Sequence, residues 1–269
     1  MALYQHSVLN KYLKLQDNVA VEKAFKKYAK YFHNPTIQQN IREAKEEQFQ
    51  EGFLRELFVN VFDYTLNPNA NYNLTTELKN EKGAKKADGA ILKDGKAVAV
   101  IELKSTKTKD LESIRQQAFD YKANQSACVY VITSNFEKLR FYINNAVDFE
   151  EFNLFTLKEE QFELLYLCLH KENILNNVPL KIKTDSVVAE EKITKTFYSD
   201  YSLFKRELFR DLVKQNLNNE IFRNELQKED KDRATKNIKL SLFKKSQKLI
   251  DRFLFIFFAE DKGLLPPNS

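Results

Sequence analysis

The spacing of apolar residues divides the chain into a helical beginning, a middle part of short strands and a helical end. Between residues 3 and 62, apolar side chains recur every three or four positions, with interruptions at residues 16–18 and at Asn34-Pro35. This pattern predicts three amphipathic helices separated at the two breaks. Turn-forming residues then gather at residues 67–73, and the period of the pattern changes after them.

Alternating apolar and polar residues predict the strands of the middle part. We expect strands at residues 72–78, 86–92, 97–103, 127–133 and 139–143, with a helix over residues 110–123 between the third and the fourth. The order of helix, strands, helix and strands is typical of an α/β fold whose mixed sheet is flanked by helices.

After residue 155 the pattern is helical, apart from a candidate extended piece at residues 178–182. The last predicted helix covers residues 232–259. We therefore expect an α/β domain at residues 1–175, followed by an all-helical region at residues 176–269.

Charge and composition restrict the class of protein only loosely. The 269 residues include 43 Lys and Arg against 38 Asp and Glu, and the resulting net charge of +5 permits a polyanionic partner without requiring one. The chain has two cysteines and no N-terminal signal pattern, so we expect a cytoplasmic protein. Its longest apolar stretch, residues 253–258, is too short to cross a membrane, and no membrane partner is expected.

Two common kinds of site can be excluded from the sequence. The five glycines are too scattered for a P-loop or a dinucleotide-binding loop, so no nucleotide is expected. The three histidines His6, His33 and His170 are isolated from one another and from paired cysteines, which excludes a recognisable zinc site.

The most informative segment is KADGAILKDGKAVAVIELKS, residues 86–105. It reads as two strands joined by a turn, and the second strand ends on Glu102 and Lys104 after a run of aliphatic residues. Because side chains alternate along a strand, Glu102 and Lys104 share one face. A charged residue in such an apolar strand costs several kcal/mol unless it is paired or binds metal.

The length of the turn decides whether Asp88 lies on the same face. A two-residue turn at Asp94-Gly95 would pair Asp88 with Ile101 and place it on the opposite face from Glu102. A three-residue loop at residues 93–95, with Gly95 in the left-handed conformation, would pair Asp88 with Val100 and bring the three charged groups together. Both turns accept the Asp-Gly sequence, and we expect the three-residue loop.

Two carboxylates and a lysine on one face would suit phosphodiester hydrolysis. Oxygen ligands from Asp88 and Glu102 favour Mg²⁺, with Mn²⁺ as a substitute, and Lys104 could orient water or stabilise charge on the phosphate. The alternative is a structural ion pair at the strand end. The tripeptide pattern alone does not decide, since Asp/Glu-x-Lys occurs eight times in the chain.

The predicted helix after the lysine carries a second element. Gln117 and Tyr121 lie four residues apart, hence on one face of the helix, and Gln-x-x-x-Tyr occurs once in the sequence. A surface glutamine beside a core tyrosine is the structural alternative.

Taken in order, these elements resemble the PD-(D/E)xK nuclease superfamily, in the branch that has a Gln-x-x-x-Tyr element. The resemblance covers residues 46–142, with an alanine at position 87 where the motif usually has proline. It implies a restriction-endonuclease-like core and a Mg²⁺-dependent DNA endonuclease. Asp88 and Glu102 would bind the metal, Lys104 would position or activate water, and Gln117 would orient Lys104 or a metal-bound water.

In that branch a carboxylate on the preceding helix often adds to the metal site. The segment at residues 46–64 resembles this helix. Glu51 is the predicted ligand because its helical spacing matches Leu54 and Phe58, and Glu47, one turn earlier, is the alternative. A solvated, exposed Glu51 is the structural alternative to both.

The segment at residues 246–266 is similar to the helical connector of single-chain restriction-modification enzymes of the type IIG or type IIS-like class. This resemblance implies a type II site-specific deoxyribonuclease, with a nuclease domain at residues 1–175 and the start of a connector at residues 176–269. Double-stranded DNA is the expected partner, with a transient dimer for double-strand cleavage. S-adenosylmethionine would bind only to a methyltransferase part that is absent from this chain.

Basic residues support a DNA partner but do not require it. They gather on the predicted C-terminal helix and around the candidate site, at Lys79, Lys82, Lys85, Lys86, Lys107 and Lys109. A solvated face is the alternative. Two functional alternatives also stay open: a non-cleaving DNA-binding or assembly module of the same fold, and a repair or phage-defence nuclease without a methyltransferase.

Overall fold

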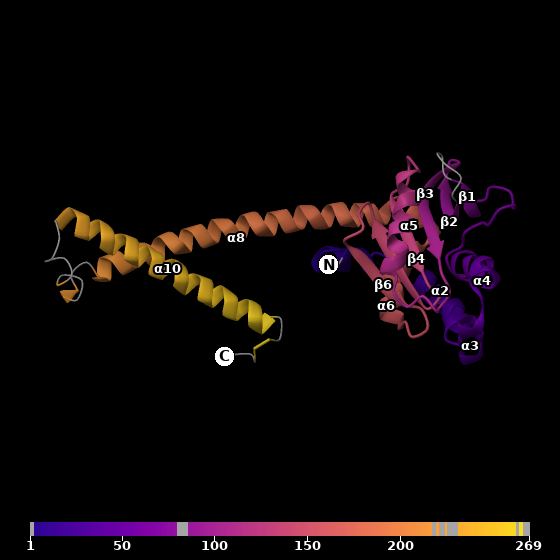
Figure 1. Ribbon diagram of the computed structural model, residues 1–269, viewed down its shortest axis with the longest axis horizontal. Coiled ribbons are helices and arrows are strands. Elements are labelled where there is room, and N and C mark those ends of the chain that lie inside the picture. Colours follow the sequence, from indigo (N-terminus) through magenta and orange to yellow (C-terminus); the bar gives the residue numbers. More distant parts are fainter. Residues whose placement is uncertain are drawn as a thin grey trace. The chain divides into compact units, whose positions relative to one another are not determined.

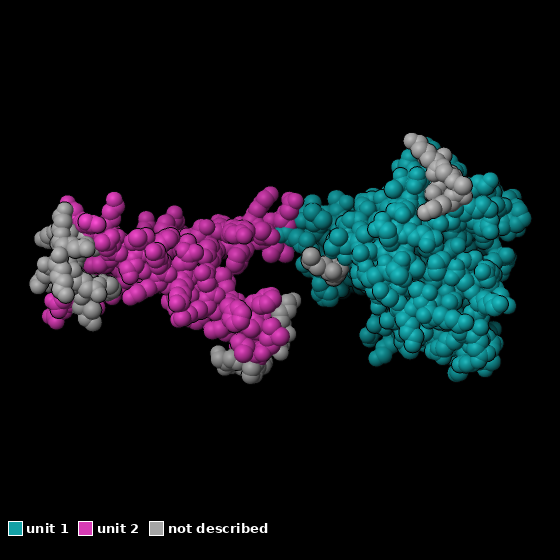
Figure 2. Space-filling view, in the orientation of Figure 1, with its two compact units in different colours: residues 1–190 teal, residues 191–269 magenta. Residues whose placement is uncertain are grey.

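The computed structural model describes residues 3–79, 86–216, 219–220, 224, 231–261 and 264–265. The chain forms two compact units, Met1–Glu190 and Glu191–Ser269, which Figure 2 shows in different colours. In the described residues, no helix is long and apolar enough to cross a membrane.

The first unit begins with consecutive helices, and the predicted breaks between them are confirmed. Asp17 and Asn34 cap the second and third helices, because their side chains accept hydrogen bonds from the first free backbone N–H groups. A further break at Ala44-Lys45 was not predicted. The helices are α1 (His6–Leu13), α2 (Asn18–Phe32), α3 (Pro35–Glu43), α4 (Glu46–Phe53) and the π-helix η1 (Leu54–Val61).

A six-stranded mixed sheet follows, as the α/β pattern predicts (Figure 1). The strands lie in chain order, and all neighbours are antiparallel except β3 and β4, which are parallel and connected through α5 (Glu112–Ala123). One edge strand was missed because Glu150 and Glu151 interrupt its apolar pattern. The strands are β1 (Leu74–Lys79), β2 (Lys86–Lys93), β3 (Lys96–Leu103), β4 (Tyr130–Ser134), β5 (Lys138–Ile143) and β6 (Phe149–Asn153).

Helices cover both faces of this sheet. Alternate residues of β3 belong to different apolar cores: Ile101 packs into the larger core with the N-terminal helices, η1 and α6 (Glu159–Leu169), whereas Val100 packs into a smaller core under α5. Because successive side chains of a strand point to opposite faces, the two cores lie on opposite sides of the sheet. The sheet is therefore buried on both faces at its centre.

Long helices follow the sheet and α7 (Lys171–Leu175). The extended piece predicted at residues 178–182 is wrong, since these residues begin the helix α8 (Val178–Asn216). The start of α8 belongs to the first unit, where Ser186 accepts a hydrogen bond from the backbone of Gln5. In the second unit, the later part of α8 packs along α10 (Lys231–Asp261), for example through Phe209 and Phe243.

The turn between β2 and β3 differs from the prediction. Lys93 pairs directly with Lys96, so the loop has two residues, Asp94 and Gly95, rather than three. Both have positive φ angles, 51° and 75°, as in the turns whose twist matches that of the flanking strands. The left-handed conformation of Gly95 is confirmed and the loop length is wrong.

A bulge in β3 nevertheless places Asp88 and Glu102 on the same face. Leu92 pairs with Ala97 and Ile91 with Ala99, so Val98 is an extra residue without a partner in β2. This extra residue shifts the pairing of β2 with β3 by one position. The two-residue turn alone would place Asp88 and Glu102 on opposite faces, and the shift brings them to the same face. Gly89 then pairs with Ile101, and the same register places Asp88 opposite Glu102, not opposite Val100 as predicted.

Replacing Gly95 by alanine should lower the free energy of unfolding by about 1 kcal/mol, because a Cβ atom is unfavourable at a φ of 75°. Nothing lies within 4 Å of that Cβ, so a steric clash does not contribute. Urea unfolding followed by circular dichroism measures the change. Asp94→Asn is the matched control, since asparagine tolerates this conformation. An unchanged stability of Gly95→Ala would contradict this account of the turn.

Candidate active site

Four charged side chains meet where β3 ends. Glu102 is buried, with 1% of its side chain exposed, and its Oε1 accepts a hydrogen bond of 3.2 Å from the amino group of Lys104. The same amino group donates to Glu46 Oε1 at 3.0 Å and to the carbonyl of Leu103 at 3.0 Å. Lys104 therefore joins a strand carboxylate to a helix carboxylate.

Asp88 is fixed by the backbone of β3. Its Oδ2 accepts a hydrogen bond of 2.7 Å from the N–H group of Leu103. The next N–H group, that of Lys104 just after β3, donates to the backbone carbonyl of Ser134 in β4. Since N–H groups alternate in direction along a strand, Leu103 faces β2, and the Asp88 carboxylate takes the place of a strand carbonyl there.

Burial and like charge change the protonation of this cluster. Burial, together with the negative charge of Asp88, raises the pKa of Glu102 to about 7. Burial also raises the pKa of Asp88, although the Leu103 N–H group and Lys104 oppose the change. Burial acts to lower the pKa of Lys104, but its hydrogen bond to Glu46 and the charges of Glu102 and Asp88 outweigh burial and raise it.

One oxygen of the cluster has no partner. Glu102 Oε2 is buried and accepts no hydrogen bond from the residues that the structure describes. A buried carboxylate oxygen without a donor or a cation is costly when ionised, which agrees with the raised pKa of this group. The oxygen is thus available to a cation.

The helix carboxylate of the cluster is Glu46, not the predicted Glu51. Glu51 lies on the exposed side of α4, with 65% of its side chain accessible, and accepts a hydrogen bond of 2.7 Å from Arg55. Glu47, the predicted alternative, is also exposed. Glu46 contacts Lys104 directly and is only 30% exposed.

A π-helix explains the misplaced carboxylate. The prediction counted back from Phe58 in α-helical turns of about 3.6 residues. In the structure, Leu54–Val61 is π-helical, and its i→i+5 hydrogen bonds add about one residue to each turn. Counting back from Phe58 through this segment therefore leads to Gln50 instead of Glu51. One turn earlier, it leads to Glu46 instead of Glu47.

Gln50 is a site residue that the sequence did not reveal. Its side chain acts to lower the pKa of Asp88, and its amide nitrogen lies 3.5 Å from Glu46 Oε1. The i, i+4 spacing of Glu46 and Gln50 was the available signal, but it acquires meaning only once the inward face of α4 is known. Gln50 connects the carboxylate of β2 with that of α4.

Gln117 and Tyr121 pair with each other on α5, as their spacing predicts. Gln117 donates a hydrogen bond of 3.1 Å to the Tyr121 hydroxyl, and Tyr121 is buried in the smaller core. In the described part of the chain, no hydrogen bond joins Gln117 to Lys104. The proposed role of Gln117 in orienting Lys104 or a water therefore stays a prediction.

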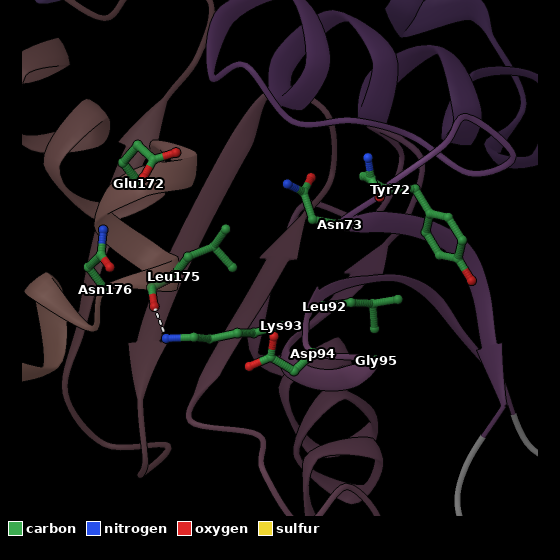
Figure 3. Close-up of a pocket in the computed structure, with 10 residues that line it drawn as sticks. Tyr72, Asn73, Leu92, Lys93, Asp94, Gly95, Glu172, Leu175 and Asn176 are labelled. Atoms are coloured by element: carbon green, nitrogen blue, oxygen red, sulfur yellow. Dashed lines mark hydrogen bonds between the residues drawn. The ribbon is translucent and has the colours of Figure 1, made fainter.

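A separate pocket lies at the other end of the β2–β3 hairpin (Figure 3). It is bordered by the Asp94-Gly95 turn, the loop around Tyr72 and helix α7. Lys93 extends across it and donates a hydrogen bond of 2.6 Å to the carbonyl of Leu175. None of the four cluster residues, Asp88, Glu102, Lys104 and Glu46, lines this pocket, so the cluster and the pocket are distinct features.

The donor set fits a hard cation with few protein ligands. Within the described residues, no group of three or more histidine, cysteine, aspartate or glutamate side chains is arranged to hold a metal ion. Mg²⁺, however, often keeps several waters and takes only one or two carboxylates from the protein. Asp88 and the free Oε2 atom of Glu102 supply two such oxygens, while Lys104 and Glu46 neutralise each other beside them.

Comparison with known proteins gives one match. The model of the family described as Type I restriction enzyme R protein N terminus matches residues 3–148. This range contains the sheet through β5, the helix α4 and every residue of the cluster. Neither a curated protein nor a solved structure matches the chain.

The raised pKa of Glu102 predicts a pH-dependent stability. Because its folded-state pKa of about 7 lies above the usual value of 4.5, its contribution to stability is present at pH 4 and is lost as the pH rises through 7. Glu102→Gln, which stays neutral, should exceed the wild-type free energy of unfolding by less than about 1 kcal/mol near pH 5 and by roughly 3 kcal/mol at pH 8.

Urea unfolding at both pH values, in the presence of EDTA, measures this difference. Glu47→Gln is the control because Glu47 is exposed. A Glu102→Gln advantage that is the same at pH 5 and pH 8 would contradict the electrostatic account of the cluster.

Proposed function

Because the chain belongs to the family of the Type I restriction enzyme R protein N terminus, we propose that it is a restriction enzyme domain that hydrolyses phosphodiester bonds of DNA with the help of Mg²⁺. The observation that carries the proposal is the convergence of Asp88, Glu102 and Lys104 at the end of β3. In order and spacing these residues match the PD-(D/E)xK pattern, and the mixed sheet with α5 between its parallel strands is compatible with a restriction-endonuclease-like core.

Asp88 and Glu102 are the proposed metal ligands. Asp88 is oriented by the Leu103 N–H group, and Glu102 offers its unpartnered Oε2 atom. Bound Mg²⁺, or Mn²⁺ in its place, would polarise the scissile phosphate and lower the pKa of a coordinated water. Positive charge beside Glu102 also favours the ionised carboxylate, which burial disfavours.

Lys104 is the proposed positioning group for the attacking water. Its amino group is held by Glu102, Glu46 and a backbone carbonyl, and its pKa is raised, which favours the cationic form at neutral pH. A fixed ammonium group can orient water or stabilise the negative charge that develops as a P–O bond forms to water and the bond to the leaving oxygen breaks. Glu46, in place of Glu51, is the helix carboxylate that sets the position of Lys104.

The class of restriction enzyme is a finer proposal. Assignment to a single-chain type IIG or type IIS-like enzyme depends on residues 246–266, which lie outside the matched range of 3–148. A methyltransferase that binds S-adenosylmethionine on the same polypeptide would support it. A non-cleaving DNA-binding module is the main alternative, and the complete set of two carboxylates and a lysine argues against it.

Lys104→Ala and Asp88→Ala should each reduce Mg²⁺-dependent DNA cleavage by the enzyme that contains this domain at least a hundredfold, because each removes a group that acts on the reacting phosphate. Lys11→Ala is the control, since Lys11 is exposed on α1. Nicking of supercoiled plasmid measures the rate, and circular dichroism checks folding. Cleavage at the wild-type rate by a folded Lys104 variant would contradict the assignment.

A matched pair of substitutions on α4 tests which carboxylate belongs to the site. Glu46→Gln should weaken Mg²⁺ or Mn²⁺ binding by the isolated chain several-fold, whereas Glu51→Gln should leave it unchanged, because Glu46 contacts Lys104 and Glu51 contacts Arg55. Calorimetric titration measures both, with Glu102→Gln as the variant that should lose binding. Equal binding by wild type and Glu102→Gln would place any metal elsewhere.

A further inference from the structure

The loop that follows β3 carries two free lysines next to the cluster. Residues 105–110 connect Lys104 with the start of α5 and include Lys107 and Lys109, both exposed. Neither side chain forms an ion pair with another residue in the ranges that the structure describes. Lys107 is three residues from Lys104, a reach of at most about 10 Å along the chain.

The backbone of this loop is anchored although its lysines are free. The N–H group of Thr108 donates to Ser105 O at 2.9 Å, and Thr108 O accepts a hydrogen bond of 2.8 Å from the side-chain amide of Asn135. Asn135 is itself buried, at 4% exposure, and Thr106 donates to the carbonyl of Arg42 at 3.3 Å. A ligand that binds the lysines would therefore not have to order the loop, which lowers the entropic cost of binding.

Two other cations of the first unit are already engaged. Arg42 lies over the ring of Phe155 and 3.9 Å from Glu137, and Lys86 pairs with Glu77 at 2.8 Å. Lys82 and Lys85, which the basic pattern also includes, lie outside the described residues. In the segment between β3 and α5, the lysines without an ion pair to a described residue are thus Lys107 and Lys109.

Negative charges close to the loop are partly satisfied. Asp110 follows Lys109 directly, and its Oδ1 accepts a hydrogen bond of 2.9 Å from the backbone of Glu112. Glu112 in turn pairs with Arg115 at 2.7 Å and Arg140 at 2.8 Å. Neither acid makes an ion pair with the loop lysines, so the two ammonium groups face solvent.

We propose that residues 105–110 form a docking surface for the sugar-phosphate backbone of double-stranded DNA, with Lys107 and Lys109 binding phosphates that flank the one placed at the cluster. The proposal rests on the proposed function and adds the surface that holds the substrate. Each DNA strand presents one phosphate per about 3.4 Å of helix axis, so lysines a few residues from Lys104 can reach neighbouring phosphates. Ammonium groups of this kind position the duplex without reading its sequence.

The test compares two double variants with the same change in net charge. Lys107→Ala/Lys109→Ala removes the loop charges, and Lys11→Ala/Lys23→Ala removes two exposed charges from α1 and α2. Binding of a 30-base-pair duplex without a recognition site is measured by fluorescence anisotropy at several salt concentrations. EDTA is present throughout, so that cleavage does not contribute.

The loop variant should lower the slope of log affinity against log salt by about 1.8 in magnitude, since each lost phosphate contact contributes about 0.9. The control variant should change the slope by less than half as much. Equal changes in the two variants would show a general effect of net charge and would overturn the proposal, as would an unchanged loop variant. Because no cleavage is measured, a failed nuclease assignment would leave this result interpretable by itself.

Discussion

The proposed chemistry of this domain depends on one buried carboxylate. Glu102 lies near the end of a largely aliphatic strand, and within the described residues only one of its two oxygens has a partner, the amino group of Lys104. An ionised carboxylate in that position is several kcal/mol less stable than in water unless a cation or hydrogen-bond donors compensate it. The pKa of about 7 expresses the same cost. The neighbouring groups can be understood as the means by which the protein tolerates this charge.

The backbone creates the arrangement through two local irregularities and one N–H group at the end of β3. The bulge at Val98 turns Asp88 toward the face of Glu102 despite a two-residue hairpin turn. Beyond the Gly89–Ile101 pair, the N–H group of Leu103 faces β2 and binds Asp88. The π-helix η1 rotates α4 so that Glu46 faces Lys104. Irregular backbone at one location is typical of functional sites, where side chains must be aimed more exactly than regular elements allow.

These irregularities also mark the limit of what the sequence could predict. The order of helices and strands followed from apolar spacing, because burial imposes a period of 2 or 3.6 on each regular element. The edge strand β6 escaped since two consecutive glutamates interrupt its apolar alternation, and the start of α8 escaped because Pro179 and Ile182 resemble an extended segment. In each case tertiary packing overrode a local pattern.

The site residues also divide into those that the sequence identified and those that it did not. Asp88, Glu102 and Lys104 were identified from the strand context, and the structure brings them together, although through a bulge rather than a longer loop. Glu46 and Gln50 could not be identified, because a count that assumes α-helical turns throughout is displaced by one residue at η1. An error of one position on a helix rotates a side chain by about 100°, which is enough to exchange the carboxylate that contacts Lys104 for a solvated one.

The central claim is that Asp88 and Glu102 together bind a divalent cation at the end of β3. Diffraction from crystals of the chain soaked in Mn²⁺, recorded where manganese scatters anomalously, locates the ion directly. The account predicts a single strong anomalous peak about 2.2 Å from Glu102 Oε2 and from an Asp88 oxygen, a distance typical of oxygen ligands to small divalent cations. A peak at another location, or none at this cluster while Mn²⁺ binds elsewhere, would contradict it.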